Sequence, residues 1–132
     1  MKTHVLDASA LIIFFEDRPG ALAVEELLGK ATDAKCPLLM SVVNWGEVYS
    51  SVWRTRGEGV ANGILLEIAQ LPIEIIAADL ELTRLAASLK AEHNLPYADC
   101  FAAALAQSRK APLVTSDKDF ARMESLLRIV WL

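Results

Sequence analysis

The chain has few cysteines, fewer basic than acidic residues, and short apolar runs. Cys36 and Cys100 are far apart and lack CxxC or Cys/His spacing, which argues against a zinc site or a disulfide framework. The longest largely apolar stretch, Ala8 to Phe15, is far shorter than the roughly 20 residues that span a bilayer. The opening residues also lack the pattern of a secretion signal, so we expect a cytoplasmic protein that does not enter membranes.

Basic charge is scarce as well. Thirteen Lys and Arg against seventeen Asp and Glu leave a net charge of −4, the wrong sign for binding nucleic acid mainly through a basic surface. What the chain does have is apolar content: 54% of its 132 residues are hydrophobic, enough to bury one core without disulfides or structural metal. We therefore predict a single folded domain over residues 1–132.

Short apolar strands alternate with segments of helical periodicity along the whole chain. This alternation implies right-handed crossovers and a mostly parallel sheet covered on both faces, hence a three-layer α/β domain. The predicted strands are 4–6, 38–40, 73–76, 112–115 and 127–131, and the predicted helices are 8–15, 21–30, 41–56, 60–70, 79–92, 97–108 and 116–123.

Acidic residues fall where such sheets bind ligands, outside the carboxyl ends of the strands. Asp7 follows the first predicted strand, and Asp117 comes two residues after the strand that ends at Thr115. Asp99 lies in the first turn of a helix whose N-terminus points toward the same edge. Glu47 lies about 200° around its helix from Trp45, away from the apolar and aromatic face.

Each acid also has an ordinary explanation. Asp7, Asp99 and Asp117 fit helix capping or first-turn positions, and Glu47 fits a solvated helix face. Four carboxylates that meet at one edge would nevertheless repel one another without a cation. Oxygen ligands suit Mg²⁺ or Mn²⁺, and such a site suits the hydrolysis of a phosphodiester by activated water.

Four blocks of sequence, in order, resemble the PIN-domain nucleases and, within them, the VapC toxins of toxin–antitoxin pairs. The blocks are Val5–Leu11, Glu47 in the central helix, Leu95–Ala104 and Leu113–Phe120. The resemblance implies a PIN-like α/β/α fold and a Mg²⁺- or Mn²⁺-dependent endoribonuclease. It also implies a homodimer, held inactive by a VapB-like antitoxin whose C-terminal segment lies across the active-site groove.

The same resemblance assigns roles to individual residues. Asp7, Glu47, Asp99 and Asp117 become the catalytic, metal-binding acids, with Asp119 as a possible fifth acid just outside them. Small polar residues, Ser9 beside the first acid and Thr115 or Ser116 near the last, are placed close to the metal or the phosphate. Tyr97, Ala98 and Cys100 depart from the commonest family residues around Asp99, but each is compatible with a helix.

Several neighbouring residues keep two interpretations. Arg54 lies on the helix face of Glu47 and is either a solvated arginine or a partner of Glu47 or of phosphate. Lys118 is either a surface charge or a contact to the RNA backbone. The Trp45 and Tyr49 stripe favours packing or a subunit contact over base stacking.

Three other functions remain as alternatives. A PIN nuclease that processes RNA without being a toxin would share every motif. A catalytically silent domain that binds RNA or a partner would keep the fold, although an intact set of acids would then be an electrostatic liability. An aspartate-nucleophile phosphatase needs a second acid two residues after Asp7, where Ser9 stands.

Overall fold

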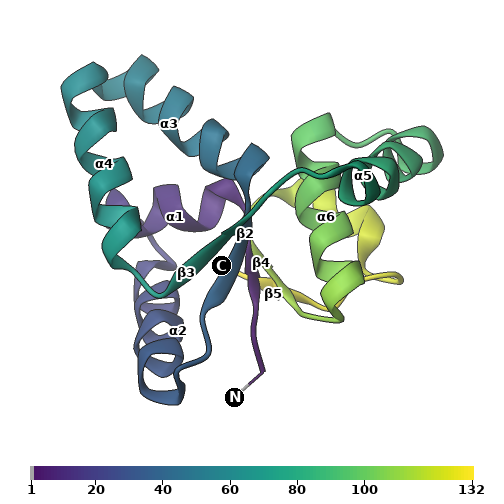
Figure 1. The fold of residues 1–132 in the computed structure, drawn as a ribbon, viewed down its shortest axis with the longest axis horizontal. Coiled ribbons are helices and arrows are strands. Elements are labelled where there is room, and N and C mark those ends of the chain that lie inside the picture. The colour runs from purple at the N-terminus through teal and green to yellow at the C-terminus, as the bar shows by residue number, and fades with distance from the viewer. Residues whose placement is uncertain (1) are drawn as a thin grey trace.

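A parallel sheet forms the centre of the computed structural model, which describes residues 2–132 and leaves Met1, the first residue of the predicted domain, outside (Figure 1). Within residues 2–132 the sheet has five strands in the order β3-β2-β1-β4-β5, and all four pairings are parallel. The predicted three-layer α/β class with a mostly parallel sheet is confirmed. The strands are β1 (Val5–Leu6), β2 (Leu38–Ser41), β3 (Ile73–Ile76), β4 (Leu113–Thr115) and β5 (Ile129–Trp131).

Helices cover both faces of this sheet (Figure 1). The first four pack on one face, and the fifth and sixth pack on the other together with a short 3₁₀ helix. The elements are α1 (Ala8–Phe15), α2 (Ala21–Ala34), α3 (Val42–Arg56), α4 (Glu58–Gln70), α5 (Leu80–His93), α6 (Tyr97–Arg109) and η1 (Lys118–Met123).

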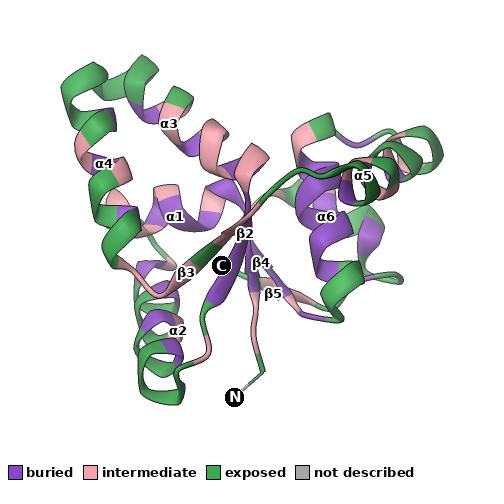
Figure 2. Cartoon of the chain, viewed as in Figure 1, coloured by how far each residue is buried: buried purple, intermediate pink, exposed green. Residues whose placement is uncertain are grey.

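Alternating strand residues supply the two cores on either side of the sheet. Val5 packs against α5 and α6, while the next residue, Leu6, packs against α1 to α4. Leu113 and Val114 divide in the same way. Successive side chains of a strand point to opposite faces, so a sheet covered on both sides is apolar at every position. Figure 2 shows these central strands as buried and the outer turns of α4 and α5 as largely exposed.

Small side chains let α6 lie close to the sheet. Every residue from Asp99 to Ala106 is buried, and four of the eight are alanines. Because an alanine side chain takes up little space between two backbones, α6 approaches both β1 and β4 closely. The first turn of α6, with Asp99, therefore comes near the ends of these strands.

Four predicted boundaries were wrong by a few residues. One is the start of η1, which lies at Lys118 rather than at residue 116 because Asp117 caps it. Helix α2 continues to Ala34, because Ala31 is buried and extends the apolar face by one turn. Helix α4 begins at Glu58 rather than at residue 60, since Gly57 alone, with φ of 93°, makes the break. Strand β5 begins at Ile129, because Leu127 still belongs to the turn that follows η1.

The strand order points to one edge of the sheet, at the carboxyl ends of β1 and β4, as the place where a ligand would bind. The chain moves from β1 outward to β2 and β3, and later returns to the other side of β1 as β4 and β5. The reversal between β1 and β4 is a topological switch point, where open α/β sheets bind ligands at the carboxyl ends of their strands. Asp7 follows β1 and Asp117 follows β4, so both lie at this point. Each helix within residues 2–132 is too short or too polar to span a lipid bilayer.

Candidate active site at the carboxyl edge of the sheet

Asp7 is held rigidly at the start of α1. It is 4% exposed, and its Oδ1 accepts a hydrogen bond from the backbone N–H of Ala10 at 3.1 Å, which caps the helix. The same oxygen accepts from the Ser9 hydroxyl at 2.7 Å, and Oδ2 accepts from the Thr115 hydroxyl at 2.5 Å. A carboxylate offers about four acceptor positions, so three of them are already occupied. Asp7 therefore has one position left for a cation, on Oδ2.

Ser9 and Thr115 join the first turn of α1 to the turn after β4. Each hydroxyl donates to Asp7, and their oxygens lie 3.3 Å apart. Ser9 Oγ accepts from the N–H of Ser116 at 3.0 Å, and Thr115 Oγ1 accepts from the N–H of Asp117 at 2.9 Å. The two side chains thus fix the backbone that carries Asp117 relative to Asp7. Ser116 contributes its backbone N–H to this arrangement.

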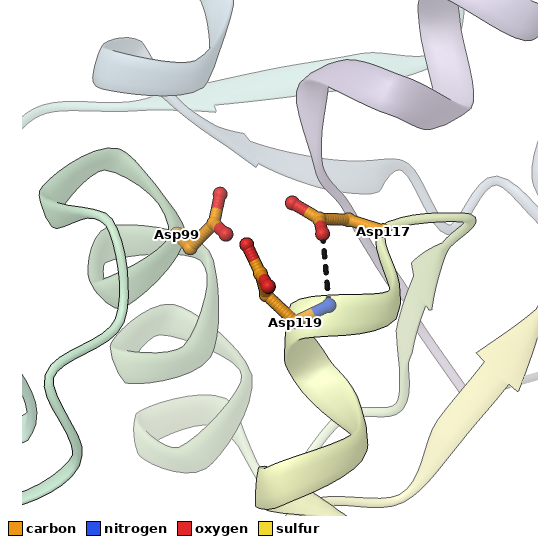
Figure 3. Close-up of side chains that lie close together, drawn as sticks. All are labelled: Asp99, Asp117 and Asp119. Carbon is orange, nitrogen blue, oxygen red and sulfur yellow. Dashed lines mark hydrogen bonds between the residues drawn. The ribbon is translucent and has the colours of Figure 1, made fainter.

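Asp99, Asp117 and Asp119 bring their carboxylates together. One oxygen from each lies within 4.8 Å of the others, and the three side chains point toward one another from α6 and from the start of η1 (Figure 3). Asp117 Oδ1 accepts from the N–H of Asp119 at 2.9 Å, which caps η1 and turns Asp119 back toward Asp99. The capping role and the clustering of the acids therefore coexist in Asp117.

Glu47 reaches the same site from α3 with help from a buried amide. Asn44, one turn earlier, is 0% exposed, and its Nδ2 donates to Glu47 Oε1 at 2.8 Å and to the carbonyl oxygen of Ala98 at 3.1 Å. Ala98 directly precedes Asp99 in the first turn of α6. Glu47 is half-buried, so it lies at the border between this polar layer and solvent.

Burial and mutual repulsion make these acids hard to ionise. Burial raises the pKa of Asp7 to about 6, although hydrogen bonds from Thr115, Ser9 and Ala10 oppose that rise. Burial also raises the pKa of Asp99 to about 8, and the neighbouring Asp117, together with Glu47 and Asp7, adds to it. The pKa of Glu47 is raised by burial and by Asp117, against the hydrogen bond from Asn44.

These mutual effects tie Asp7, Glu47, Asp99 and Asp117 into one electrostatic unit. Each of the three shifted acids experiences the charge of Asp117, and Asp99 experiences all three of its neighbours. Clusters of acids with raised pKa values are typical of functional sites, because a cation must offset their repulsion when they are all ionised.

The donor set fits a hard divalent cation. Asp99 Oδ2 is buried and lacks a hydrogen-bond partner anywhere in the described part of the chain, and one carboxylate oxygen of Asp99 lies within 4.8 Å of an oxygen of Asp117 and of Asp119. A buried oxygen without a partner is unfavourable unless something binds it. Carboxylate oxygens without nitrogen or sulfur ligands suit Mg²⁺ or Mn²⁺ better than softer metals.

The flanking cations stand apart from this layer. Arg54 and Lys118 are exposed, and neither forms an ion pair with an acid of the site within residues 2–132. Trp45 and Tyr49 pack against the core formed by α1 to α4, and the Tyr49 ring makes an edge contact with Trp53. Cys100 is fully buried in α6.

One residue of the site, Asn44, was not predicted from the sequence, and another, Asp119, was predicted to lie just outside the acids that bind metal. Asn44 was missed, since an asparagine in a helix carries no signal of its own; its position three residues before Glu47 was the available hint. Asp119 was placed just outside the acids that bind metal, yet its carboxylate lies in the tightest group with Asp99 and Asp117. The tight 3₁₀ turn, which the sequence suggests only as a short helix, brings it there.

The comparison with protein families agrees with this fold. The model of the PIN domain matches residues 4–126, almost the whole chain. The chain therefore belongs to the PIN domain family, and its acids occupy the edge of the sheet described above. No curated protein matches the chain in sequence.

Several solved structures with a similar fold come from toxin–antitoxin systems. VapBC2 from Rickettsia felis, bound to a DNA fragment from its promoter, is 19% identical with a TM-score of 0.76, and the match covers 98% of each chain. VapBC-5 from Mycobacterium tuberculosis is 24% identical with a TM-score of 0.66, over 100% of each chain. The M. tuberculosis toxin VapC20, which cleaves the sarcin–ricin loop, is 14% identical with a TM-score of 0.71, over 91% of this chain and 94% of that one.

Proposed function

We propose that the protein is a divalent-cation-dependent endoribonuclease and the toxin of a VapBC-like toxin–antitoxin pair. The observation that carries the proposal is the meeting of Asp99, Asp117 and Asp119 at the switch point of the sheet, next to Asp7 and Glu47. Membership of the PIN domain family supports nuclease chemistry. The toxin–antitoxin context of the structural neighbours supports the biological role.

In this proposal three of the acids bind the cation directly, and Asp7 and Glu47 lie next to it. Asp99, Asp117 and Asp119 offer the oxygens that hold Mg²⁺ or Mn²⁺, because they converge and because Asp99 Oδ2 lacks a partner in the described residues. Asp7 offers its one remaining lone pair, and Glu47 faces the same space from α3. Once bound, the cation supplies positive charge that activates water and stabilises the oxygen leaving the phosphorus.

The remaining polar residues act on the acids and on the substrate backbone. Ser9 and Thr115 keep the Asp7 carboxylate in one orientation and hold the turn that bears Asp117. Ser116 positions this turn through its N–H. In this proposal the exposed side chains of Arg54 and Lys118 contact phosphates of the RNA strand, and such contacts position RNA without reading its sequence.

The VapBC context of the structural neighbours supports regulation by a partner protein. We infer a homodimer that a VapB-like antitoxin inactivates by laying a segment across the acidic edge. Basic side chains of such a segment would meet the same carboxylates that bind the cation, so inhibitor and cation would compete.

The direct test is cleavage of a labelled single-stranded RNA by the purified protein in the presence of Mg²⁺, Mn²⁺ or EDTA. We expect internal cleavage with either cation and none with EDTA. In Asp117→Asn the cleavage rate is expected to fall more than about 100-fold, a larger loss than that caused by substituting residues that only contact the metal ligands. Asp33→Asn is the matched control, since Asp33 is an exposed acid on α2. Cleavage unaffected by EDTA or by Asp117→Asn would contradict the proposal.

A second experiment separates a toxin from a nuclease of RNA processing. Induced expression of the wild type and of Asp7→Asn is followed by growth curves and by mapping of new RNA ends. A toxin arrests growth and creates new internal ends that Asp7→Asn does not create. New ends without growth arrest would favour an RNA-processing nuclease instead.

A further inference from the structure

One buried amide joins the two helices that carry Glu47 and Asp99. Asn44 lies in the first turn of α3, and both protons of its Nδ2 are used: one on Glu47 Oε1, the other on the carbonyl of Ala98 in the first turn of α6. Helices α3 and α6 belong mainly to cores on opposite faces of the sheet. The amide is therefore a polar connection between the two layers at the acidic edge.

The orientation of this amide is determined by its surroundings. A flipped amide would place Oδ1 against the Glu47 carboxylate and against the Ala98 carbonyl, which are both acceptors. In the observed orientation Oδ1 is buried without a hydrogen-bond partner among residues 2–132. Because an unpaired buried oxygen is unfavourable, packing alone favours an apolar side chain of similar volume here.

We propose that Asn44 is a positioning residue, which fixes the Glu47 carboxylate relative to Asp99 so that both act on one cation. This inference rests on the proposed function. A neutral donor suits the task, since it orients Glu47 without adding negative charge to a crowded set of acids. A lysine in the same place would neutralise Glu47 and compete with the cation.

The test measures Mn²⁺ binding by titration calorimetry on the full chain, without RNA. For Asn44→Leu we expect Mn²⁺ affinity to fall about 10- to 100-fold, the range for residues that orient metal ligands. Asn62→Leu is the matched control: Asn62 on α4 accepts a hydrogen bond from Tyr49 of α3, so it also contacts α3 but lies away from the acids. The control is expected to bind Mn²⁺ as the wild type does.

A double-mutant cycle with Glu47→Gln separates positioning from a general loss of structure. If Asn44 acts through Glu47, then Asn44→Leu weakens Mn²⁺ binding little further once Glu47→Gln is present. Wild-type affinity in Asn44→Leu, or the same loss with and without Glu47→Gln, would overturn the inference. If Asn44→Leu does not fold, Asn44→Ser takes its place, because a serine hydroxyl is too short to reach both acceptors.

Crystal structures keep this result distinct from a failure of the proposed function. If the wild type binds no Mn²⁺, the proposed function fails, while the position of Glu47 can still be compared between the wild type and Asn44→Leu. A Glu47 carboxylate that turns away from Asp99 in the variant supports positioning. A carboxylate that stays in place without the amide contradicts it.

Discussion

The two edges of the sheet contrast in how they treat polar groups. At the carboxyl edge, Asp7, Asp99 and Thr115 are buried and the pKa values of both acids are raised. At the amino edge, Lys2, Lys110 and Arg128 are exposed around a hollow of about 400 Å³. That hollow exceeds the one of about 230 Å³ beside α5 and α6, and neither includes an acid of the site.

This contrast shows that the burial of polar groups indicates the position of the site better than the size of a hollow does. Charges at the amino edge keep their water, and their placement costs the fold little. Acids at the carboxyl edge lose water and repel one another, so the fold accepts a cost there that a bound cation or a bound proton offsets.

The largest effect is expected for Asp99→Asn, which removes the acid with the most strongly raised pKa. RNA cleavage is expected to fall more than about 100-fold, because a cation ligand is lost. The melting temperature of the metal-free protein is expected to rise by at least about 5 °C, since repulsion with Asp117 disappears. Scanning calorimetry in EDTA checks this, and a lower melting temperature with retained cleavage would contradict the site assignment.

The metal-free protein should lose stability as the pH rises. Asp7 and Asp99 have folded-state pKa values of about 6 and 8, against an ordinary value of 3.8. Between about pH 4 and pH 8 the folded state holds more protons than the unfolded state, so the free energy of unfolding falls with pH. Urea unfolding in EDTA across this range measures the slope, and saturating Mn²⁺ should flatten or reverse it. A free energy that rises steadily with pH in EDTA would argue against the cluster.

Thr115→Val tests the hydroxyl network at the carboxyl edge. It leaves Asp7 Oδ2 and the N–H of Asp117 without their partner, so we expect a loss of about 1 to 3 kcal/mol in the free energy of unfolding. Cleavage should also fall, because Asp7 is no longer held in place. Thr115→Ser keeps the hydroxyl and is expected to retain most of the stability and activity. Equal behaviour of the two variants in denaturation and RNA assays would show that the network is unimportant.

The smallest effect is expected at the amino edge. Lys110→Ala and Arg128→Ala remove exposed charges, and neither residue forms an ion pair within the described chain. We expect free energies of unfolding within about 0.5 kcal/mol of the wild type, and unchanged Mn²⁺ affinity. A change in Mn²⁺ affinity as large as that of the carboxyl-edge variants would erase the contrast between the edges.

Much of the fold could be predicted because apolar periodicity and chain breakers decide it. Strands β2 to β4 and helices α1, α3 and α6 were predicted within about one residue of their bounds, since buried strands and amphipathic helices have strong patterns. The end of α2 and the start of α4 were wrong by a few residues. There, tertiary contacts at Ala31 and the single φ of Gly57 decide the boundary, and neither is legible from composition.

The site divides in a similar way. Asp7 and Asp117 could be predicted to lie at one edge because strand ends in a parallel sheet share an edge, and Asp99 because a helix start points there. Asp119 and Asn44 depend on the exact path of a 3₁₀ turn and on a contact between α3 and Ala98. Such contacts join residues far apart in the sequence, and a single sequence carries no record of them.

The central claim is that acids from separate elements bind one hard cation at the carboxyl edge. Anomalous diffraction from crystals soaked in Mn²⁺ tests it most directly. A single strong peak is expected among the carboxylates of Asp99, Asp117 and Asp119, and it should be absent from Asp99→Asn crystals. Peaks elsewhere on the molecule, with these carboxylates bare at saturating Mn²⁺, would contradict it.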